Sequence, residues 1–118
     1  MGDGHAAQGD GELTGNALET SMEIEFMVDV IQGENVSGPR AENDEYLMVF
    51  GIGGSLQEAL QFATTGLAQW IEGDYKLNSS EVAVVLGTSI RYDIAEIVDP
   101  HLNVVAKIRK SVLAQINK

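Results

Sequence analysis

The sequence predicts an α+β fold, in which a small mixed or antiparallel sheet of about four strands packs against one long helix and one shorter helix. Two strand-like segments precede the middle of the chain and two follow it. Between them, residues 55–72 carry apolar side chains at helical spacing. The 118 residues contain no internal repeat and suffice for a single domain, residues 1–118.

The first part of the chain has the composition of a loop. Residues 1–16 are rich in glycine and acidic residues and contain few large apolar side chains. We therefore divide the predicted domain into a loop, residues 1–16, and an α+β body, residues 17–118.

Two strands are predicted before the long helix. Residues 21–31 alternate in polarity, which predicts a half-buried strand with one apolar face formed by Met22, Ile24, Phe26, Val28 and Val30. Residues 32–44 are polar and contain glycine and proline, so we expect a turn or a long hairpin loop. Residues 45–52 form a continuous apolar run, which is typical of a strand buried on both faces.

Capping patterns mark the two helices. Ser55, followed by Glu58 three residues later, predicts the start of the long helix, and Gly73 with Asp74 predicts its end. Asn78 and Glu81 repeat the capping pattern and predict a shorter helix that Gly87 could end. The valines of this second segment also suit a strand.

The chain then returns to strand-like patterns. Residues 91–98 alternate in polarity and predict a third strand. Asp99, Pro100 and His101 predict a turn. Residues 102–109 predict the last strand, and the tail after Lys110 is long enough for a helical turn.

The composition excludes several classes of partner. The net charge is −11, with only seven Lys and Arg, so we expect neither nucleic acid nor an anionic membrane as a partner. No apolar run has the length of a membrane-spanning helix, and the polar, acidic amino end does not have the composition of a signal peptide. The chain has no cysteine, which excludes disulfides and thiolate metal sites and is compatible with the cytoplasmic location that we expect.

The segment from Gly2 to Glu12 offers one imidazole, three carboxylates and one carboxamide. Its glycines allow the backbone to bend so that these groups converge. Asp3 and His5 are spaced so that both can reach one ion from an extended segment. Nitrogen and oxygen ligands suit a divalent metal, and we expect zinc; Glu12 is placed to orient or deprotonate a metal-bound water. A solvated tail and a calcium-binding loop are the alternative interpretations.

At this segment the sequence resembles the acetamidase/formamidase family. The string GDGHAAQGDGELTGNALETS is similar to that family's Gly-Asp-x-His-Ala-Ala-x-Gly-Asp-Gly-Glu motif with its following Glu-Thr or Glu-Ser. The similarity continues through EYLMVFGIGGSLQEAL, a strand followed by a helix, and through YDIAEIVDPHLNVVAKIRKS, which resembles the family's closing strands. The resemblance covers nearly the whole chain and places it in the C-terminal part of the family's sequence.

The resemblance implies hydrolysis of short linear amides, such as formamide or acetamide, to a carboxylate and ammonia. It implies that Asp3 and His5 are metal ligands, and that Asp10 and Glu12 line the same site as ligand, base or supporting residues.

The chain departs from the family pattern at its amino end. Family members have a substantial region before the motif, and that region contributes to the site, whereas here the motif begins at Gly2. We therefore expect an incomplete metal site in the isolated chain, and a homo-oligomer or another chain that supplies the missing region. The alternatives are a catalytically inactive remnant or assembly module with the same fold, and a metal-binding module without hydrolysis.

Overall fold

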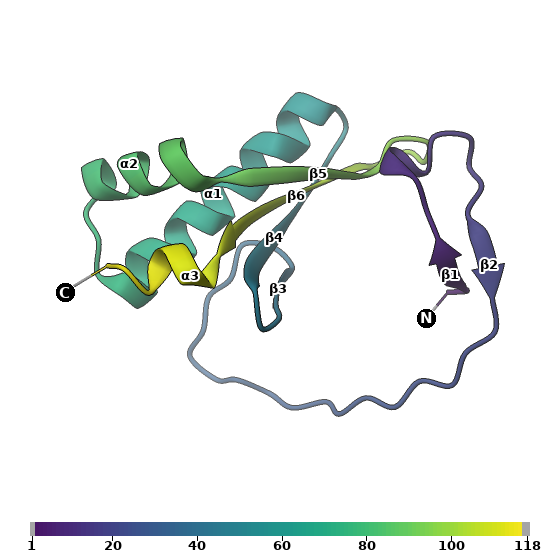
Figure 1. Cartoon of the computed structure of the whole chain (residues 1–118), viewed down its shortest axis with the longest axis horizontal. Coiled ribbons are helices and arrows are strands. Elements are labelled where there is room, and N and C mark those ends of the chain that lie inside the picture. Colours follow the sequence, from purple (N-terminus) through teal and green to yellow (C-terminus); the bar gives the residue numbers. More distant parts are fainter. Residues whose placement is uncertain (1, 117–118) are drawn as a thin grey trace.

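A four-stranded antiparallel sheet covered by helices forms most of the chain (Figure 1). The structure is a computed structural model, and it describes residues 2–116. The sheet has the strand order β3–β4–β6–β5, so β4 and β6 are its central strands. The strand bounds are Arg40–Glu42 for β3, Tyr46–Gly53 for β4, Arg91–Glu96 for β5 and Leu102–Arg109 for β6. This confirms the predicted α+β class.

The core lies between the central strands and the helices α1, Leu56–Tyr75, and α2, Ser79–Ser89. One face of β4 and β6 is buried against α1 because apolar side chains alternate along both strands. The prediction that residues 45–52 are buried on both faces was wrong, because the alternate residues of β4 remain partly exposed. The core side chains come from all four elements and from the short helix α3, Lys110–Leu113, and include Leu47, Val49, Leu67, Ile71, Val82, Leu86, Ile108 and Leu113.

The helix starts agree with the capping patterns. The Ser55 side chain accepts a hydrogen bond from the backbone N–H of Glu58, and Asn78 forms a complete capping box with Glu81. Residues 79–89 are therefore helical, as predicted, and the strand alternative is excluded. The predicted ends were too early, because α1 continues to Tyr75 and Gly87 lies inside α2.

The strand prediction for residues 21–31 was wrong. The only strand in this part of the chain is β2, Leu18–Thr20, and residues 21–31 are extended without belonging to a sheet. Their apolar side chains are exposed. The physical reason is that no strand of residues 2–116 runs beside this segment, so its main-chain groups lack a ladder partner. The fourth strand of the main sheet is β3 instead, within the region predicted as a loop.

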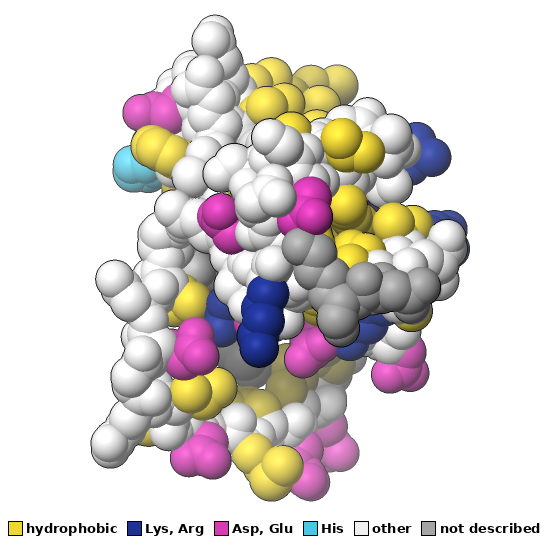
Figure 2. Space-filling model, turned by 90° about the vertical axis from the view of Figure 1, so that its left-hand side faces the viewer, with side chains coloured by type: hydrophobic (Ala, Val, Ile, Leu, Met, Phe, Trp, Pro, Cys, Tyr) yellow, Lys and Arg dark blue, Asp and Glu magenta, His cyan; other side chains and the backbone are white. Residues whose placement is uncertain are grey.

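Residues 2–36, which we call the amino-terminal arm, lie outside the four-stranded sheet and meet it at η1, beside the end of β5 (Figure 1). The arm begins with β1, Gly4–Ala7, passes through a single 3₁₀ turn, η1, at Asp10–Glu12, and returns as β2. The radius of gyration is 15.7 Å, against roughly 13.5 Å for a compact domain of this size. Figure 2 shows hydrophobic and acidic side chains together on the lowest part of the surface, where the arm passes.

No helix within the described range is both long enough and apolar enough to cross a membrane.

Candidate metal site of the amino-terminal motif

The motif residues are positioned by a two-stranded hairpin. Strand β1 pairs antiparallel with β2, and this register places His5 opposite Glu19. The register shifts between His5 and Ala7, so one residue of β1 bulges out of the ladder. The predicted loop 1–16 therefore contains a strand, and that strand brings a second carboxylate beside the imidazole.

The turn of the hairpin is fixed to the end of β5. The Gly11 carbonyl accepts a hydrogen bond from the backbone N–H of Ile97 at 3.0 Å. Gly11 has a φ of +71°, and a Cβ atom at this position would lie 2.8 Å from Cγ1 of Ile97, so only glycine fits without a shift. Glu12 also has a positive φ of 49°, which is uncommon for a residue with a side chain. The amino-terminal motif is thus held in place by residues more than eighty positions later.

A carboxamide fixes the orientation of the imidazole. Nε2 of Gln8 donates to the Ala95 carbonyl at 3.0 Å, so Oε1 of Gln8 is the atom that faces Nδ1 of His5, at 2.8 Å. Because an amide oxygen only accepts, Nδ1 of His5 carries the proton. Nε2 of a neutral His5 is then left with a free lone pair, which is the state that a metal ligand requires.

Asp3, His5 and Glu19 form the first cluster. One ligand atom from each lies within 4.8 Å of the other two. Nε2 of His5 is 3.4 Å from Oδ2 of Asp3, and the two side chains are 26% and 60% exposed. A backbone hydrogen bond, followed by side-chain hydrogen bonds with Glu19 and His5, lowers the pKa of Asp3. The cluster therefore presents one nitrogen and two carboxylates at an accessible edge.

Glu12, Glu96 and Asp99 form a second cluster of the same size. A side-chain hydrogen bond with Glu96 is the largest cause that raises the pKa of Glu12, followed by burial. The backbone N–H of Val98 lowers the pKa of Glu96 by donating to its carboxylate. The pKa values of the two neighbouring glutamates are therefore shifted in opposite directions, upward at Glu12 and downward at Glu96.

Glu12 connects the two clusters. Its Oε1 lies 3.9 Å from Nε2 of His5, and its side chain is 16% exposed. The pKa of His5 is raised, first by the hydrogen bond with Gln8 and then by Asp3 and Glu12. Of the four residues predicted from the sequence, three thus meet around the imidazole edge: Asp3, His5 and Glu12.

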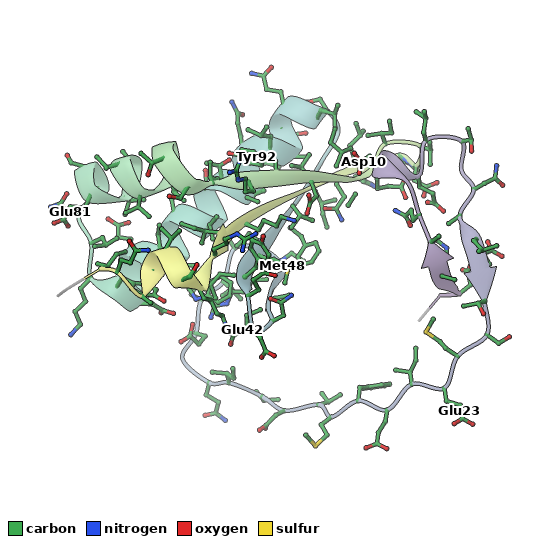
Figure 3. The ribbon with its side chains drawn as sticks, in the orientation of Figure 1. Asp10, Glu23, Glu42, Met48, Glu81 and Tyr92 are labelled. Carbon is green, nitrogen blue, oxygen red and sulfur yellow. The ribbon has the colours of Figure 1, made fainter. Side chains whose placement is uncertain are left out.

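Asp10 lies apart from this group. It belongs to η1, at the end of the arm that meets the β5–β6 connection (Figure 3). Its side chain has no hydrogen bond or ion pair to any residue from 2 to 116. The sequence reasoning gave no role to Glu19, Glu96 and Asp99. The only available signals were the Glu-Thr and Val-Asp-Pro strings, which carry no spacing that points to the imidazole.

A hollow of about 520 Å³ opens beside Asp3, between β1 and the start of the exposed segment, and Thr20, Met22 and Ile24 contribute to its wall. Two other cavities lie between residues 34–39, β4 and α1, away from the motif. The hollow meets the first cluster only at Asp3, since neither His5 nor Glu19 contributes to its wall.

No family model matches the sequence, and no curated protein matches it. Solved structures do match. An acetamidase from Yersinia enterocolitica shares 32% sequence identity with a TM-score of 0.83, over 94% of this chain and 34% of the acetamidase chain.

Two further crystal structures have the same fold. A predicted acetamidase/formamidase from Thermoanaerobacter tengcongensis is 23% identical with a TM-score of 0.85, over 95% of this chain and 37% of that one. An acetamidase from Bacillus halodurans is 20% identical with a TM-score of 0.73, over 97% of this chain and 39% of that one. This chain spans slightly more than a third of the length of the proteins it matches, and its resemblance to the acetamidase/formamidase family is confirmed.

Proposed function

We propose that this chain contributes a metal site to a hydrolase that cleaves the C–N bond of short linear amides, of the formamide or acetamide kind. The observation that carries the proposal is the convergence of Asp3, His5 and Glu19, whose ligand atoms lie within 4.8 Å of one another. The match to acetamidase structures supports the same reaction class.

The donor set fits a divalent metal, and zinc suits it best. One imidazole nitrogen and two carboxylate oxygens are ligands that zinc accepts in catalytic sites, which keep a further position open. Gln8 supports this assignment because it leaves Nε2 of His5 as the unprotonated nitrogen. When bound, the metal would lower the pKa of a water and polarise the amide carbonyl.

Glu12 is the proposed proton carrier. It lies next to His5, and in its ionised form its carboxylate would take a proton from the attacking water and return it to the departing amine. The resemblance also assigns Asp10 to the site. In the proposed assembly Asp10 acts only as a supporting residue, since its side chain makes no hydrogen bond or ion pair with the described motif residues.

The isolated chain is proposed to be incomplete. The cluster sits on the exposed edge of a hairpin, and the match covers only 34 to 39% of the neighbour chains. A further polypeptide unit, or another copy of this chain, would close the site and exclude water. A catalytically inactive assembly module with this fold is the alternative, and the exposed apolar side chains of the arm support it.

Metal content and ammonia release separate these functions. The purified chain is loaded with zinc, and ammonia is measured after incubation with formamide and with acetamide. His5→Ala should abolish zinc binding, whereas His101→Ala, at the other and exposed histidine, should leave it unchanged.

Zinc binding with ammonia release supports the amidase. Zinc binding without ammonia release supports a metal-binding module or an enzyme that needs a partner. If the wild-type chain binds no zinc, the proposed metal site is contradicted, and the alternative function, a catalytically inactive assembly module, remains.

A further inference from the structure

The outer edge of β5 has no strand beside it in the described part of the chain, since β5 pairs only with β6. The arm of the same copy reaches β5 only at Ala95, whose carbonyl accepts a hydrogen bond from Gln8. The edge from Arg91 to Ile94 is therefore free. Tyr92 and Ile94 point to the helix-covered face and are 38% and 42% exposed. An exposed edge of this kind can accept a further strand.

A strand added to β5 would also cover apolar surface on α1. Thr64 donates to the Leu60 carbonyl, and its Oγ1 lies 2.6 Å from the hydroxyl of Tyr92. This turn of α1 therefore lies beside β5, and the Leu60 side chain is exposed. Apolar side chains on an added strand would bury part of Leu60 and Tyr92, which is favourable.

The opposite edge of the sheet is a poorer site for an added strand. β3 has only three residues, Arg40–Glu42. Its cation is already engaged, because the Arg40 guanidinium is 3.1 Å from a Glu34 carboxylate oxygen and 4.6 Å from the centre of the Trp70 ring. A strand with an acidic face would find no free positive charge there.

Residues 21–31 have the pattern that the β5 edge requires. Apolar side chains such as Phe26 and Val28 occupy one side of the extended backbone and are exposed, and acids occupy the other side. No backbone–backbone hydrogen bond in the described part of the chain joins these residues to another segment. They do not lie beside β5 of their own copy, since Glu23 and Tyr92 are on opposite sides of the molecule in Figure 3.

An antiparallel pairing of this segment with β5 matches the apolar faces in four registers, in which Tyr92 and Ile94 both face apolar residues. Three of the four place an acid directly opposite Asp93, and like charges in that position destabilise a strand pair. These three registers set Ile24, Phe26 or Val30 opposite Tyr92 and bring Glu23, Glu25 or Asp29, respectively, to Asp93.

The fourth register sets Val28 opposite Tyr92 and opposes no acids. Met27 then faces Asp93, and Phe26 faces Ile94. The same register brings Asp29 opposite Arg91, the one opposite-charge pair of the contact.

Arg91 is available for this pairing. Its side chain is exposed and makes no ion pair with any residue from 2 to 116. The neighbouring acid Asp93 is already neutralised by Lys107, whose Nζ is 2.6 Å away. A carboxylate opposite Arg91 would therefore be the first to reach this cation.

Two other arrangements of two copies also oppose no acids. A parallel register places Glu25 beside Arg91, but parallel pairs are slightly less stable, and all pairs of the main sheet are antiparallel. Two copies of residues 21–31 could also pair with each other, centred on Val28. That ribbon of two strands would be marginally stable in water and would leave its apolar face exposed.

We propose that residues 26–29 add to the edge Arg91–Ile94 of a second copy of this chain, antiparallel and with Asp29 opposite Arg91. Each copy offers one segment and one edge, so a reciprocal exchange closes at a dimer. Because only four residues pair at each edge, the dimer forms at high concentration and the single copy prevails in dilute solution. The pairing requires neither metal binding nor hydrolysis at the motif.

Sedimentation velocity tests the proposal on the full chain without metal, between roughly 10 µM and 1 mM, where a weak dimer should dissociate and form. Asp29→Arg and Arg91→Asp should each weaken the dimer by about tenfold, and the double variant should restore it. Glu25→Arg is the matched control, because it changes the charge equally and lies opposite Ala95. Circular dichroism of each variant in dilute solution checks that the single copy is folded.

Nuclear Overhauser effects between labelled and unlabelled copies give the second measurement. Contacts between the Val28 methyl groups and the Tyr92 ring are expected only at high concentration, together with protection of the amides of residues 26–29. A chain that stays monomeric, a dimer that neither Asp29→Arg nor Arg91→Asp weakens, rescue of Arg91→Asp by Glu25→Arg instead of Asp29→Arg, or the same contacts within one dilute copy would each overturn the proposal.

Discussion

Residues 21–31 of the amino-terminal arm and the strand β6 have the same kind of alternating sequence pattern, but only β6 buries its apolar side chains. Residues 102–109 alternate and lie at the centre of the sheet, where Val104, Ala106 and Ile108 are buried. Residues 21–31 alternate as regularly, and their apolar side chains face solvent. The difference lies in the neighbouring strands, because β6 has β4 and β5 on its two sides, whereas no strand within residues 2–116 lies beside residues 21–31. An alternating pattern shows that a segment has an apolar face that it could bury. Whether that face is buried depends on neighbouring strands and helices.

The largest expected effect comes from shortening one apolar side chain in each of the two segments and comparing the changes in the free energy of unfolding. Ile108→Ala removes a fully buried side chain and should lower the free energy of unfolding by about 2–5 kcal/mol. Phe26→Ala removes an exposed ring, and the change should stay within about 0.5 kcal/mol. Urea denaturation followed by circular dichroism measures both. Equal losses would show that the arm is packed in solution.

The next test concerns the point where the arm meets the body. Gln8→Ala removes the contact between His5 and the Ala95 carbonyl, and the imidazole loses its fixed orientation. Supporting residues of this kind typically change metal affinity by about 10–100-fold. Zinc titration by calorimetry measures the loss. Asn16→Ala is the control, since among residues 2–116 the Asn16 side chain donates hydrogen bonds only to Thr14, in the same arm. An unchanged affinity in Gln8→Ala would mean that His5 does not bind the ion.

The pH dependence of zinc binding gives a third test. Zinc binds neutral imidazole, so its affinity should fall by about tenfold per pH unit below the pKa of His5. That pKa is raised, chiefly by Gln8, so the decline begins at a higher pH than for an ordinary histidine. Gln8→Ala should move the onset to lower pH.

In the absence of metal, the pH dependence of folding stability runs in the opposite direction to that of zinc affinity. The contacts of protonated His5 contribute stability at low pH, and this contribution is lost as the pH rises through the raised pKa. Imidazole chemical shifts recorded by NMR in wild type and Gln8→Ala follow the pKa directly. Identical titration curves would contradict the role of Gln8.

The smallest effect is expected at Glu12, whose backbone adopts a left-handed conformation. Glu12→Gly removes the steric cost of that conformation and should raise the free energy of unfolding by about 1 kcal/mol or less. Glu12→Gln keeps the backbone cost and removes the acid. Suppose that both variants lose ammonia release and that only the glycine variant gains stability. The strained backbone conformation at Glu12 would then be tolerated because the Glu12 side chain is needed for activity. Lower stability in Glu12→Gly would show that the hydrogen bond with Glu96 outweighs the strain.

The parts that the sequence predicted well are those determined by local patterns. The start of α1 follows from Ser55 and Glu58, and the start of α2 from Asn78 and Glu81, because each cap needs only residues three positions apart. The central strands followed from apolar patterning. The same reasoning gave a wrong strand prediction for residues 21–31, because an alternating pattern does not show whether a partner strand is present.

In the candidate site, too, the residues within one short motif were predicted, and those brought in by contacts between distant segments were not. Asp3, His5 and Glu12 belong to one short motif and were predicted from it. Glu19 reaches His5 through strand pairing, and Glu96 reaches Glu12 only after the turn of the hairpin docks against β5. No local rule places residues more than eighty positions apart next to each other, so the pairing of Glu12 with Glu96 was missed.

The register shift in β5 connects this strand to the orientation of His5, the proposed metal ligand. β5 is an edge strand, and Ala95 falls in the shift between Ile94 and Glu96, where its carbonyl receives Gln8. An insertion, deletion or change of side-chain size at residues 94–97 would move that carbonyl, and the imidazole would turn with it. Variation among natural homologues in these four positions should therefore track metal preference, even though none of them except Glu96 has a side chain that could reach an ion.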